Sequence, residues 1–261
     1  MIAPSSDTLL RVWEENQHAH PTVRALNVLA CAWPEGSRGA WSTASIGQRD
    51  GSLLILLERL FGGSVRTTAS CPKCGVRLES DFDVQDIRSD AAVLPAPDET
   101  LHAQHRGYDV AYRLPTSDDV LQVIAEAAAP RCGKTDRGAR PDRDFDSASR
   151  LLARCVSRVR RDDDELDAAS LPDDVIAAVA ADMARNDPDA DVRIALECPA
   201  CSTTWETRFD IVSYFWGELD DWAQRLLADV HTLARAYGWS ERAILALSPA
   251  RRGIYLDMVG A

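Results

Sequence analysis

The sequence predicts an α+β fold that is mostly helical, with a small β zinc ribbon built from two distant, repeated Cys-Pro-x-Cys hairpins. Two observations carry this prediction. Apolar residues recur at helical spacing over most of the chain, whereas they alternate with period two only in a few short segments, two of which surround paired cysteines. With 261 residues and 46% hydrophobic content, the chain is long enough to bury a sizeable core.

Residues 1–63 form the predicted N-terminal helical region. An apolar stripe over Leu9–Trp13 follows a Ser-Asp start, and Pro21 can open a second helix that runs to Cys31. After a loop rich in Gly, Ser and Trp, we expect a third helix over Arg49–Phe61, which Gly62 and Gly63 end.

Two segments, residues 64–88 and 191–212, are predicted as zinc-knuckle hairpins and are copies of each other. Each runs as a strand, a Cys-Pro-x-Cys turn and a second strand, with the same spacing and no insertion. This unbroken match indicates an internal repeat rather than a chance resemblance. The matched positions are Val65/Val192, Arg66/Arg193, Cys71/Cys198, Pro72/Pro199, Cys74/Cys201, Glu79/Glu206, Phe82/Phe209 and Asp83/Asp210.

Residues 89–190, between the hairpins, are predicted as an inserted α/β subdomain. Strands are expected from alternation and helices from apolar stripes behind Pro, Ser or Asp starts. The expected elements are a loop over Ser89–Thr100, a strand over Tyr108–Leu114, a helix from Pro115 to Ala129, a loop with local disorder over Pro130–Arg143, and helices over Phe145–Arg160 and Asp173–Arg185 joined by an acidic connector.

The remaining residues, 213–261, form the predicted C-terminal helical region. A long amphipathic helix is expected over Trp216–Tyr237, because leucines and valines recur along one side of it. A short helix over Ser240–Leu247 and a last helix opened by Ser248 and Pro249 complete the chain.

Four cysteines, Cys71, Cys74, Cys198 and Cys201, are the predicted ligands of one zinc ion. Two cysteines separated by two residues in a tight turn can direct both thiolates at one ion, and two such turns complete a tetrahedral shell. Thiolate sulfur selects zinc over magnesium or calcium. Because the protein fills all four positions, no place is left for a substrate or water, so we expect a structural site.

Four alternative interpretations of these cysteines remain open. A redox Cys-x-x-Cys pair is disfavoured because two pairs stand in repeated hairpins, and an iron–sulfur cluster lacks its usual clustered spacing. A zinc enzyme would need three ligands and a water. A zinc-ribbon adaptor acting on nucleic acid or on the transcription machinery is the main alternative, against which the acidic chain argues.

Composition narrows the class of protein further. The net charge is −12, with 41 acidic and 29 basic residues, which disfavours contact with nucleic acid or anionic lipid. No apolar run approaches the roughly 20 residues of a membrane span, and the first residues lack the pattern of an export signal. Seven cysteines without an export signal favour a reducing compartment, so we expect a cytoplasmic protein.

Three groups of segments resemble a known family. They are Gly47-Gln48-Arg49-Asp50 with Leu53–Phe61 and the first knuckle; Tyr112-Arg113-Leu114-Pro115-Thr116; and the run from the second knuckle through Tyr237–Glu241, Ile244–Pro249, Arg251-Arg252 and Tyr255-Leu256. Together they resemble the baseplate hub assembly proteins or chaperones of contractile-tailed phages and of phage-tail-like contractile injection systems.

The resemblance implies a non-enzymatic protein that helps to build or dock a baseplate hub through contacts with hub, wedge or tail-tube proteins. It implies no catalytic residue, nucleic acid, membrane or small-molecule substrate, and a place in the assembled particle is compatible with it. The dense C-terminal motif leads to the hypothesis of a docking surface, formed or supported by Trp239, Ile244, Leu247, Arg251, Arg252 and Tyr255.

Overall fold

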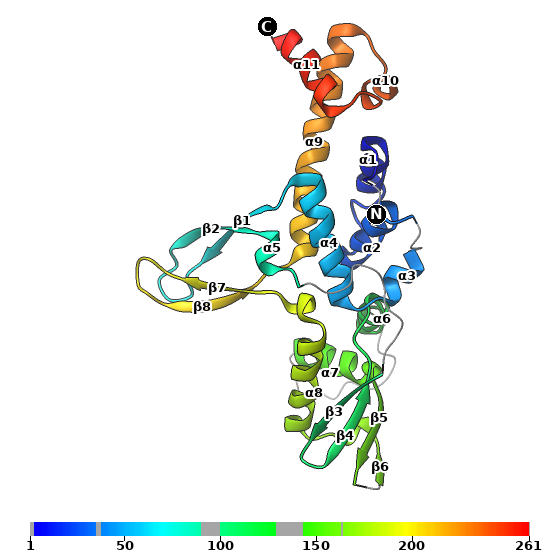
Figure 1. Cartoon of the computed structure of the whole chain (residues 1–261), viewed down its shortest axis with the longest axis vertical. Coiled ribbons are helices and arrows are strands. Elements are labelled where there is room, and N and C mark those ends of the chain that lie inside the picture. Colours follow the sequence, from blue (N-terminus) through cyan, green and yellow to red (C-terminus); the bar gives the residue numbers. More distant parts are fainter. Residues whose placement is uncertain (1–2, 35–37, 90–99, 129–142, 163, 261) are drawn as a thin grey trace.

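The protein is elongated, with helices stacked along its long axis and a pair of β-hairpins projecting to one side (Figure 1). A computed structural model describes residues 3–34, 38–89, 100–128, 143–162 and 164–260. In agreement with the sequence-based prediction, the fold is a mostly helical α+β fold, and over the described residues its β-structure is divided among three separate antiparallel sheets.

The helical body lies at the centre of the molecule and holds the largest core. Four leucines of one helix, Leu53, Leu54, Leu56 and Leu57, are 1% exposed or less, and burying each stabilises the fold by about 1.5–3 kcal/mol. The body consists of α1 (Ser6–Glu15), α2 (Pro21–Ala32), α3 (Arg38–Thr43), α4 (Ile46–Phe61) and the first half of α9 (Ile211–Tyr237).

The stretch predicted as a Gly/Ser/Trp loop contains the short helix α3, so that prediction was wrong in part. Trp41 of α3 is fully buried and meets the ring of Trp33 edge-on, with 5.4 Å between the ring centroids. Burial of a large aromatic side chain in the core outweighs the weak helix propensity of the surrounding glycine and serines.

Two helices begin earlier than the apolar periodicity predicted, and side-chain caps explain both. At the start of α4, Ser45 accepts from the Gln48 backbone N–H, while the Gln48 side chain accepts from the Ser45 N–H. At the start of α9, the Asp210 carboxylate accepts from the Ser213 backbone N–H at 3.1 Å.

The two repeated hairpins project together from the body as one arm (Figure 1). The first pairs β1 (Ser64–Ser70) with β2 (Arg77–Asp83), and the second pairs β7 (Arg193–Glu197) with β8 (Thr204–Arg208). At the base of the arm the rings of Phe82 and Phe209 meet edge-on at 5.5 Å. These two phenylalanines occupy equivalent positions of the repeat, so the copies face each other. The one-turn helix α5 (Val84–Ile87) follows β2.

The insert carries a four-stranded antiparallel sheet in the order β3-β4-β5-β6, at the other end of the molecule from the C-terminus (Figure 1). Its strands are β3 (Leu101–His105), β4 (Tyr108–Tyr112), β5 (Val156–Arg161) and β6 (Asp164–Leu166). Its helices are α6 (Ser117–Ala128), α7 (Arg143–Cys155), α8 (Asp173–Asn186) and the short 3-10 turns η1 (Ala168–Ser170) and η2 (Pro188–Asp191).

Two predictions about the insert were wrong. The helix expected over Phe145–Arg160 ends at Cys155, and β5 begins at the next residue. The acidic connector that follows contributes β6. In both cases pairing with distant residues decides the outcome: Val159 of β5 lies opposite Val110 of β4, and both are buried against α8. The expected loops lie almost wholly outside the described residues, including 90–99 and 129–142.

The C-terminal helices form a small module at the far end of α9. Gly238 ends α9 in the left-handed conformation, with φ 68°, which a glycine adopts without strain. Then α10 (Glu241–Leu245) and α11 (Pro249–Gly260) fold back onto Val230 and Leu233. Because 27 residues of helix span about 40 Å, α9 carries this module well beyond the helical body. Within the described ranges, none of the helices combines the length and apolarity needed to span a membrane.

Candidate metal centre

The tips of the two hairpins bring the four predicted cysteines together, although residues 75–197 separate the pairs in the sequence. The ligand atoms of Cys71, Cys74, Cys198 and Cys201 all lie within 4.8 Å of one another. In the described part of the chain these four side chains make up the group that could hold a metal ion.

The sulfur separations fit a single tetrahedral ion. Cys71 Sγ lies 3.6 Å from Cys201 Sγ, and Cys74 Sγ lies 3.5 Å from Cys198 Sγ. Four sulfurs at about 2.3 Å from a tetrahedral centre stand about 3.8 Å apart. The observed distances are close to that value and much longer than the roughly 2.05 Å of a disulfide. Each close pair joins one hairpin to the other, so an ion bound here would clamp both tips.

The turns supply donors that favour the thiolate form of two of these cysteines. Burial disfavours the Cys71 thiolate, yet the backbone N–H groups of Cys74 and Lys73 outweigh burial and lower the pKa of Cys71. The Thr203 hydroxyl, 3.3 Å from Cys201 Sγ, and the Thr203 backbone lower the pKa of Cys201 to about 6. Donors that orient and stabilise ligand sulfurs are typical of metal-binding turns.

Opposing contacts act on the pKa of Cys74 within the cluster. The Val76 backbone N–H favours its thiolate, but the neighbouring sulfurs, that of Cys198 foremost, raise the pKa of Cys74 to about 12. The Cys74 thiol keeps its proton because it is hydrogen-bonded to the neighbouring sulfurs, and burial acts in the same direction. A divalent cation at the centre would take the place of this shared proton, so the donor set suits a bound cation.

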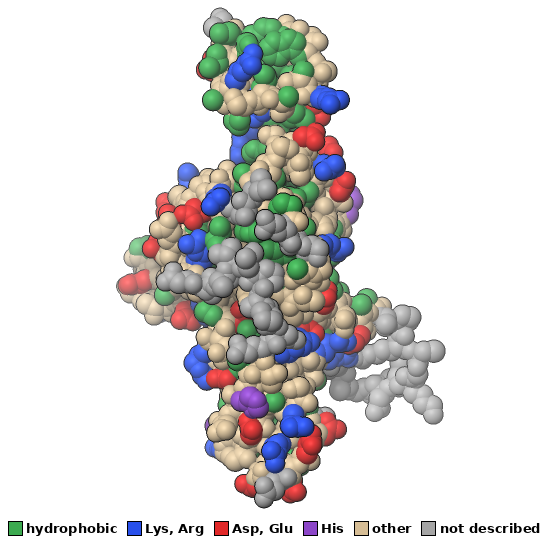
Figure 2. Space-filling model, turned by 45° about the vertical axis from the view of Figure 1, so that its right-hand side comes forward, with side chains coloured by type: hydrophobic (Ala, Val, Ile, Leu, Met, Phe, Trp, Pro, Cys, Tyr) green, Lys and Arg blue, Asp and Glu red, His purple; other side chains and the backbone are tan. Residues whose placement is uncertain are grey.

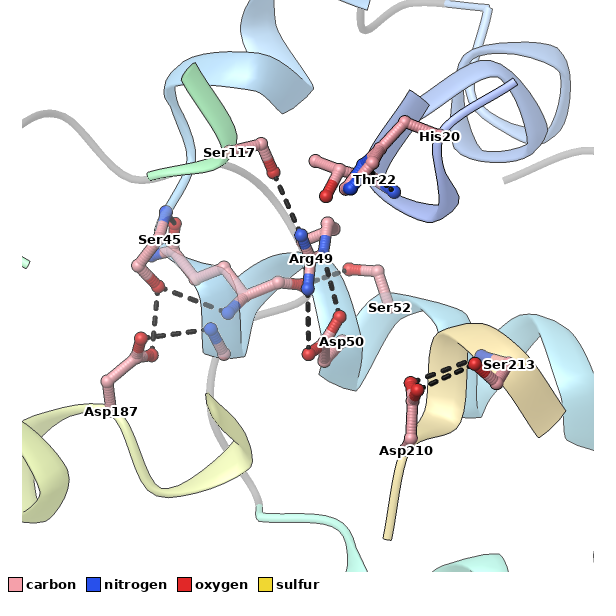
Figure 3. A network of polar contacts seen from close by, with 12 residues as sticks. His20, Thr22, Ser45, Arg49, Asp50, Ser52, Ser117, Asp187, Asp210 and Ser213 are labelled. Atoms are coloured by element: carbon pink, nitrogen blue, oxygen red, sulfur yellow. Dashed lines mark hydrogen bonds and ion pairs between the residues drawn. The ribbon is translucent and has the colours of Figure 1, made fainter. Parts of the chain in front are cut away.

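A second polar cluster lies buried where α4 begins, beside η2 (Figure 3). Asp187 accepts hydrogen bonds from the Ser45 hydroxyl at 2.8 Å and from the Gly47 backbone N–H at 2.9 Å. The Gly47 N–H lies in the first turn of α4, where helical N–H groups lack partners within the helix, so the carboxylate satisfies a free donor. Burial raises the pKa of Asp187, and these two hydrogen bonds offset it only in part.

Glycines on one face of α4 let η2 approach this closely. A Cβ on Gly47 would lie 2.2 Å from Asp187 Oδ1, and one on Gly51 would lie 2.5 Å from Asp189 Oδ2. Asp189 in turn accepts from the backbone N–H and the hydroxyl of Ser89, both at 2.8 Å. The connector that precedes the second hairpin is thereby fixed to α4 and to the end of the first hairpin segment.

The segment from β4 to α6 completes this cluster, which we term the polar joint. Ile46 N–H donates to the Pro115 carbonyl at 3.0 Å, and Arg49 Nη1 donates to Ser117 Oγ at 3.2 Å. Arg49 also donates to both carboxylate oxygens of Asp50, at 2.7 and 3.0 Å. Burial raises the pKa of Asp50, while the Arg49 guanidinium works in the opposite direction.

Asp119 ties the start of α6 to the chain that precedes it. Its carboxylate accepts two hydrogen bonds from Arg113, at 2.6 and 2.7 Å, and one from the Thr116 N–H at 2.9 Å. Burial disfavours the charged carboxylate, but Arg113 and Thr116 outweigh it and lower the pKa of Asp119. The bidentate pair therefore fixes the path of the chain from β4 into α6.

Sequence reasoning did not predict the polar joint, although its signal was present. Two of the segments that carry the family resemblance, residues 47–50 and 112–116, meet at this joint. Gly47, two residues before the predicted helix start at Arg49, and Gly51, in the first turn of that predicted helix, were the local sign of a close approach. The partner in that approach, Asp187, lies 140 residues away from Gly47 and no local pattern indicates it.

The residues of the hypothetical docking surface lie in the C-terminal module, but at different depths. Ile244 is fully buried and Arg252 is 6% exposed, with Arg252 Nε 3.4 Å from Asp229 Oδ2 of α9. Trp239 and Tyr255 are half-buried and meet edge-on at 4.9 Å, Leu247 is half-buried, and Arg251 is exposed. The structure thus places Ile244 and Arg252 beneath the surface that the other four residues line.

Comparison with known proteins identifies a family for this chain. No curated protein and no solved structure gives a match. A family described as T4 bacteriophage base plate protein matches residues 30–216, which is well over half of the 261 residues. The matched range includes the polar joint, the insert and all four clustered cysteines, and it ends before the C-terminal module. The chain belongs to the T4 bacteriophage base plate protein family.

Proposed function

We propose that this protein builds or docks the baseplate hub of a contractile tail or contractile injection system, with one structural zinc ion at the tips of its hairpins. The family match is the observation that carries the proposal. Members of this family are baseplate structural proteins, which are typically non-enzymatic and make contacts with other tail proteins. We further propose that these partners are hub, wedge or tail-tube proteins, and that the protein acts in assembly or as a chaperone.

The shape of the molecule supports a connecting role. Three parts project from the helical body in different directions: the hairpin arm, the insert and the C-terminal module (Figure 1). A protein that links several neighbours needs separate surfaces held at fixed angles. The polar joint sets the angle of the insert, and the zinc ion holds the two hairpins of the arm together. We propose that the C-terminal surface lined by Trp239, Leu247, Arg251 and Tyr255, supported by Ile244 and Arg252, is one of the docking sites.

Zinc is the ion that the donor set favours. Four thiolates in tetrahedral arrangement suit Zn²⁺, and a shell filled entirely by protein indicates a structural role. Structural zinc contributes about 10–16 kcal/mol of apparent binding free energy in small peptides. A contribution of this size offsets the entropy cost of closing the long loop between the hairpins.

The alternative function, a zinc-ribbon adaptor for nucleic acid, fits the arm less well. Arg193 and Arg208 of the second hairpin both pair with Asp191, at 2.8 and 2.6 Å. Acidic residues at least match basic ones in both hairpin segments. A surface neutralised in this way lacks the excess of positive charge on which phosphate binding depends.

The proposal is tested by an in-frame deletion in the native host, complemented with the wild-type gene. Electron microscopy of the deletion strain should show tails that lack a complete baseplate, and complementation should restore it. Affinity purification of the tagged protein, followed by mass spectrometry, should recover hub, wedge or tail-tube proteins. Normal tails in the deletion strain, or recovery of RNA polymerase without tail proteins, would overturn the proposal.

A further inference from the structure

The last helix, α11, is apolar on two sides. Its inner side, with Tyr255 and Leu256, packs on the core of the C-terminal module. Its outer side presents Ile254 and Met258, which are 56% and 61% exposed. A surface helix is expected to be polar on its solvent side, so two large exposed apolar residues one turn apart indicate a face without its partner.

The outer side forms a stripe along the helix axis. Arg251, Ile254 and Met258 stand three and four residues apart, a spacing that places them on one face of a helix. We call these three residues the α11 stripe. Figure 2 shows hydrophobic side chains gathered at this end of the molecule, with cationic side chains beside them. A straight stripe on a helix is complementary to a second helix packed alongside it.

Rigid aromatic residues support the edge of the stripe. Tyr237 stacks on Trp239 with 4.7 Å between the centroids, and Tyr255 meets Trp239 edge-on. Arg251 lies over the Tyr255 ring at 5.7 Å and donates to the Tyr255 hydroxyl at 3.3 Å. Its guanidinium is therefore held in place before any partner arrives, which lowers the entropy lost on binding. Aromatic residues, methionine and arginine are the residue types enriched in protein interfaces.

Charge decides which kind of partner fits. Over residues 235–260 there are four arginines and two acidic residues, whereas the whole chain carries a net charge of −12. Arg235, Arg242 and Arg251 are exposed together with Glu241 and Asp257, whereas Arg252 is buried and paired with Asp229. The surface of the module therefore carries a small excess of positive charge on an otherwise acidic protein.

We infer that the α11 stripe binds an acidic amphipathic helix of another tail protein, with apolar residues on Ile254 and Met258 and carboxylates near Arg251. This inference rests on the proposed docking role of the C-terminal module and names the chemistry of its partner. Met258, with its flexible and polarisable side chain, adapts to the apolar face of such a helix.

A designed peptide tests the inference on the full-length protein. The probe is a fluorescein-labelled 18-residue helix with leucines along one face and glutamates flanking them, and its counterpart carries lysines in place of the glutamates. In anisotropy titrations the glutamate peptide should bind at least about 10-fold more tightly than the lysine peptide, a difference equivalent to about 1.4 kcal/mol. Equal affinity of the two peptides would overturn the inference.

Variants locate the binding face. The double variant Ile254→Ser, Met258→Ser should weaken binding of the glutamate peptide by about 10-fold, and Arg251→Glu should weaken it further by charge reversal. Both exposed apolar positions lie outside the core, and circular dichroism should show the wild-type helix content. The matched control is Ile124→Ser, which removes another exposed isoleucine, on α6, and should leave the affinity unchanged. An unaltered affinity in the double variant would refute the assignment.

A photo-crosslinker in place of Ile254 extends the test to assembling tails. It should join this position to an acidic helical segment of another tail protein, whereas a crosslink to a second copy of this chain would contradict the inference. The two proposals fail separately. Normal tails in the deletion strain overturn the function, whereas defective tails together with an unaltered peptide affinity in the double variant overturn only the partner assigned to the α11 stripe.

Discussion

The close contact between α4 and η2 makes a specific prediction about Gly47. An alanine in a helix normally stabilises it by up to about 1 kcal/mol relative to glycine. At Gly47 we expect the opposite sign, because the new Cβ would lie 2.2 Å from Asp187 Oδ1 and 3.0 Å from the Ala190 backbone nitrogen. The Asp187 side chain can rotate away from the methyl group, but the backbone of η2 must move.

The magnitude follows from three contributions. Forcing η2 away from α4 costs about 1–3 kcal/mol, as in other overpacked sites. Loss of the 2.9 Å hydrogen bond from Gly47 N–H to Asp187 removes about 1 kcal/mol. The helix propensity of alanine returns up to about 1 kcal/mol. Gly47→Ala should therefore destabilise the protein by about 1–3 kcal/mol, and each kcal/mol should lower Tm by about 2–4 °C.

The assay is urea and thermal unfolding followed by far-UV circular dichroism, and α9 supplies the control. Gly217 lies within that helix, and a Cβ there would meet nothing within 4 Å. Gly217→Ala should therefore stabilise the protein by about 0.5–1 kcal/mol. If Gly47→Ala stabilises the protein as much as Gly217→Ala does, the reasoning about close approach at the polar joint is refuted.

Three further predictions address the metal, an ion pair and the core. Cys198→Ser should abolish a zinc content of one ion per chain, measured by elemental analysis, and lower the unfolding midpoint, whereas Cys31→Ser should retain the metal. Asp119→Asn should destabilise the protein by about 2–4 kcal/mol at pH 7, because it leaves Arg113 without its carboxylate. The lowered pKa of Asp119 means that its contribution is present above about pH 4 and lost as the pH falls through the folded-state pKa, so wild type and variant should converge in acid. Leu219→Ala should cost about 2–5 kcal/mol by opening a cavity, and a smaller loss in urea unfolding would contradict the packing described for α9.

Local patterns predicted those parts of the fold that local physics controls. The stripes of α1, α2, α8 and α9 predicted helices, because an apolar face at 3.6-residue spacing needs only its own segment to be recognised. Helix starts were less accurate, since the caps Ser45 and Asp210 lie outside the apolar stripe. The strands β5 and β6 were missed because their pairing partners, not their own residues, make them strands.

Local patterns were enough to predict a mostly helical α+β protein with paired cysteines in a repeated hairpin, since thiolate spacing and hairpin periodicity can be recognised over about 20 residues. The repeat predicted that the cysteines of both copies come together, and the structure confirms it, with all four ligand atoms within 4.8 Å of one another. Long-range packing, by contrast, places Gly47 against Asp187, and it leaves Ile254 and Met258 exposed while Tyr255 packs inward. These contacts form between segments that are distant in the sequence. Their free energy depends on the residues of both segments together, so neither segment alone predicts them.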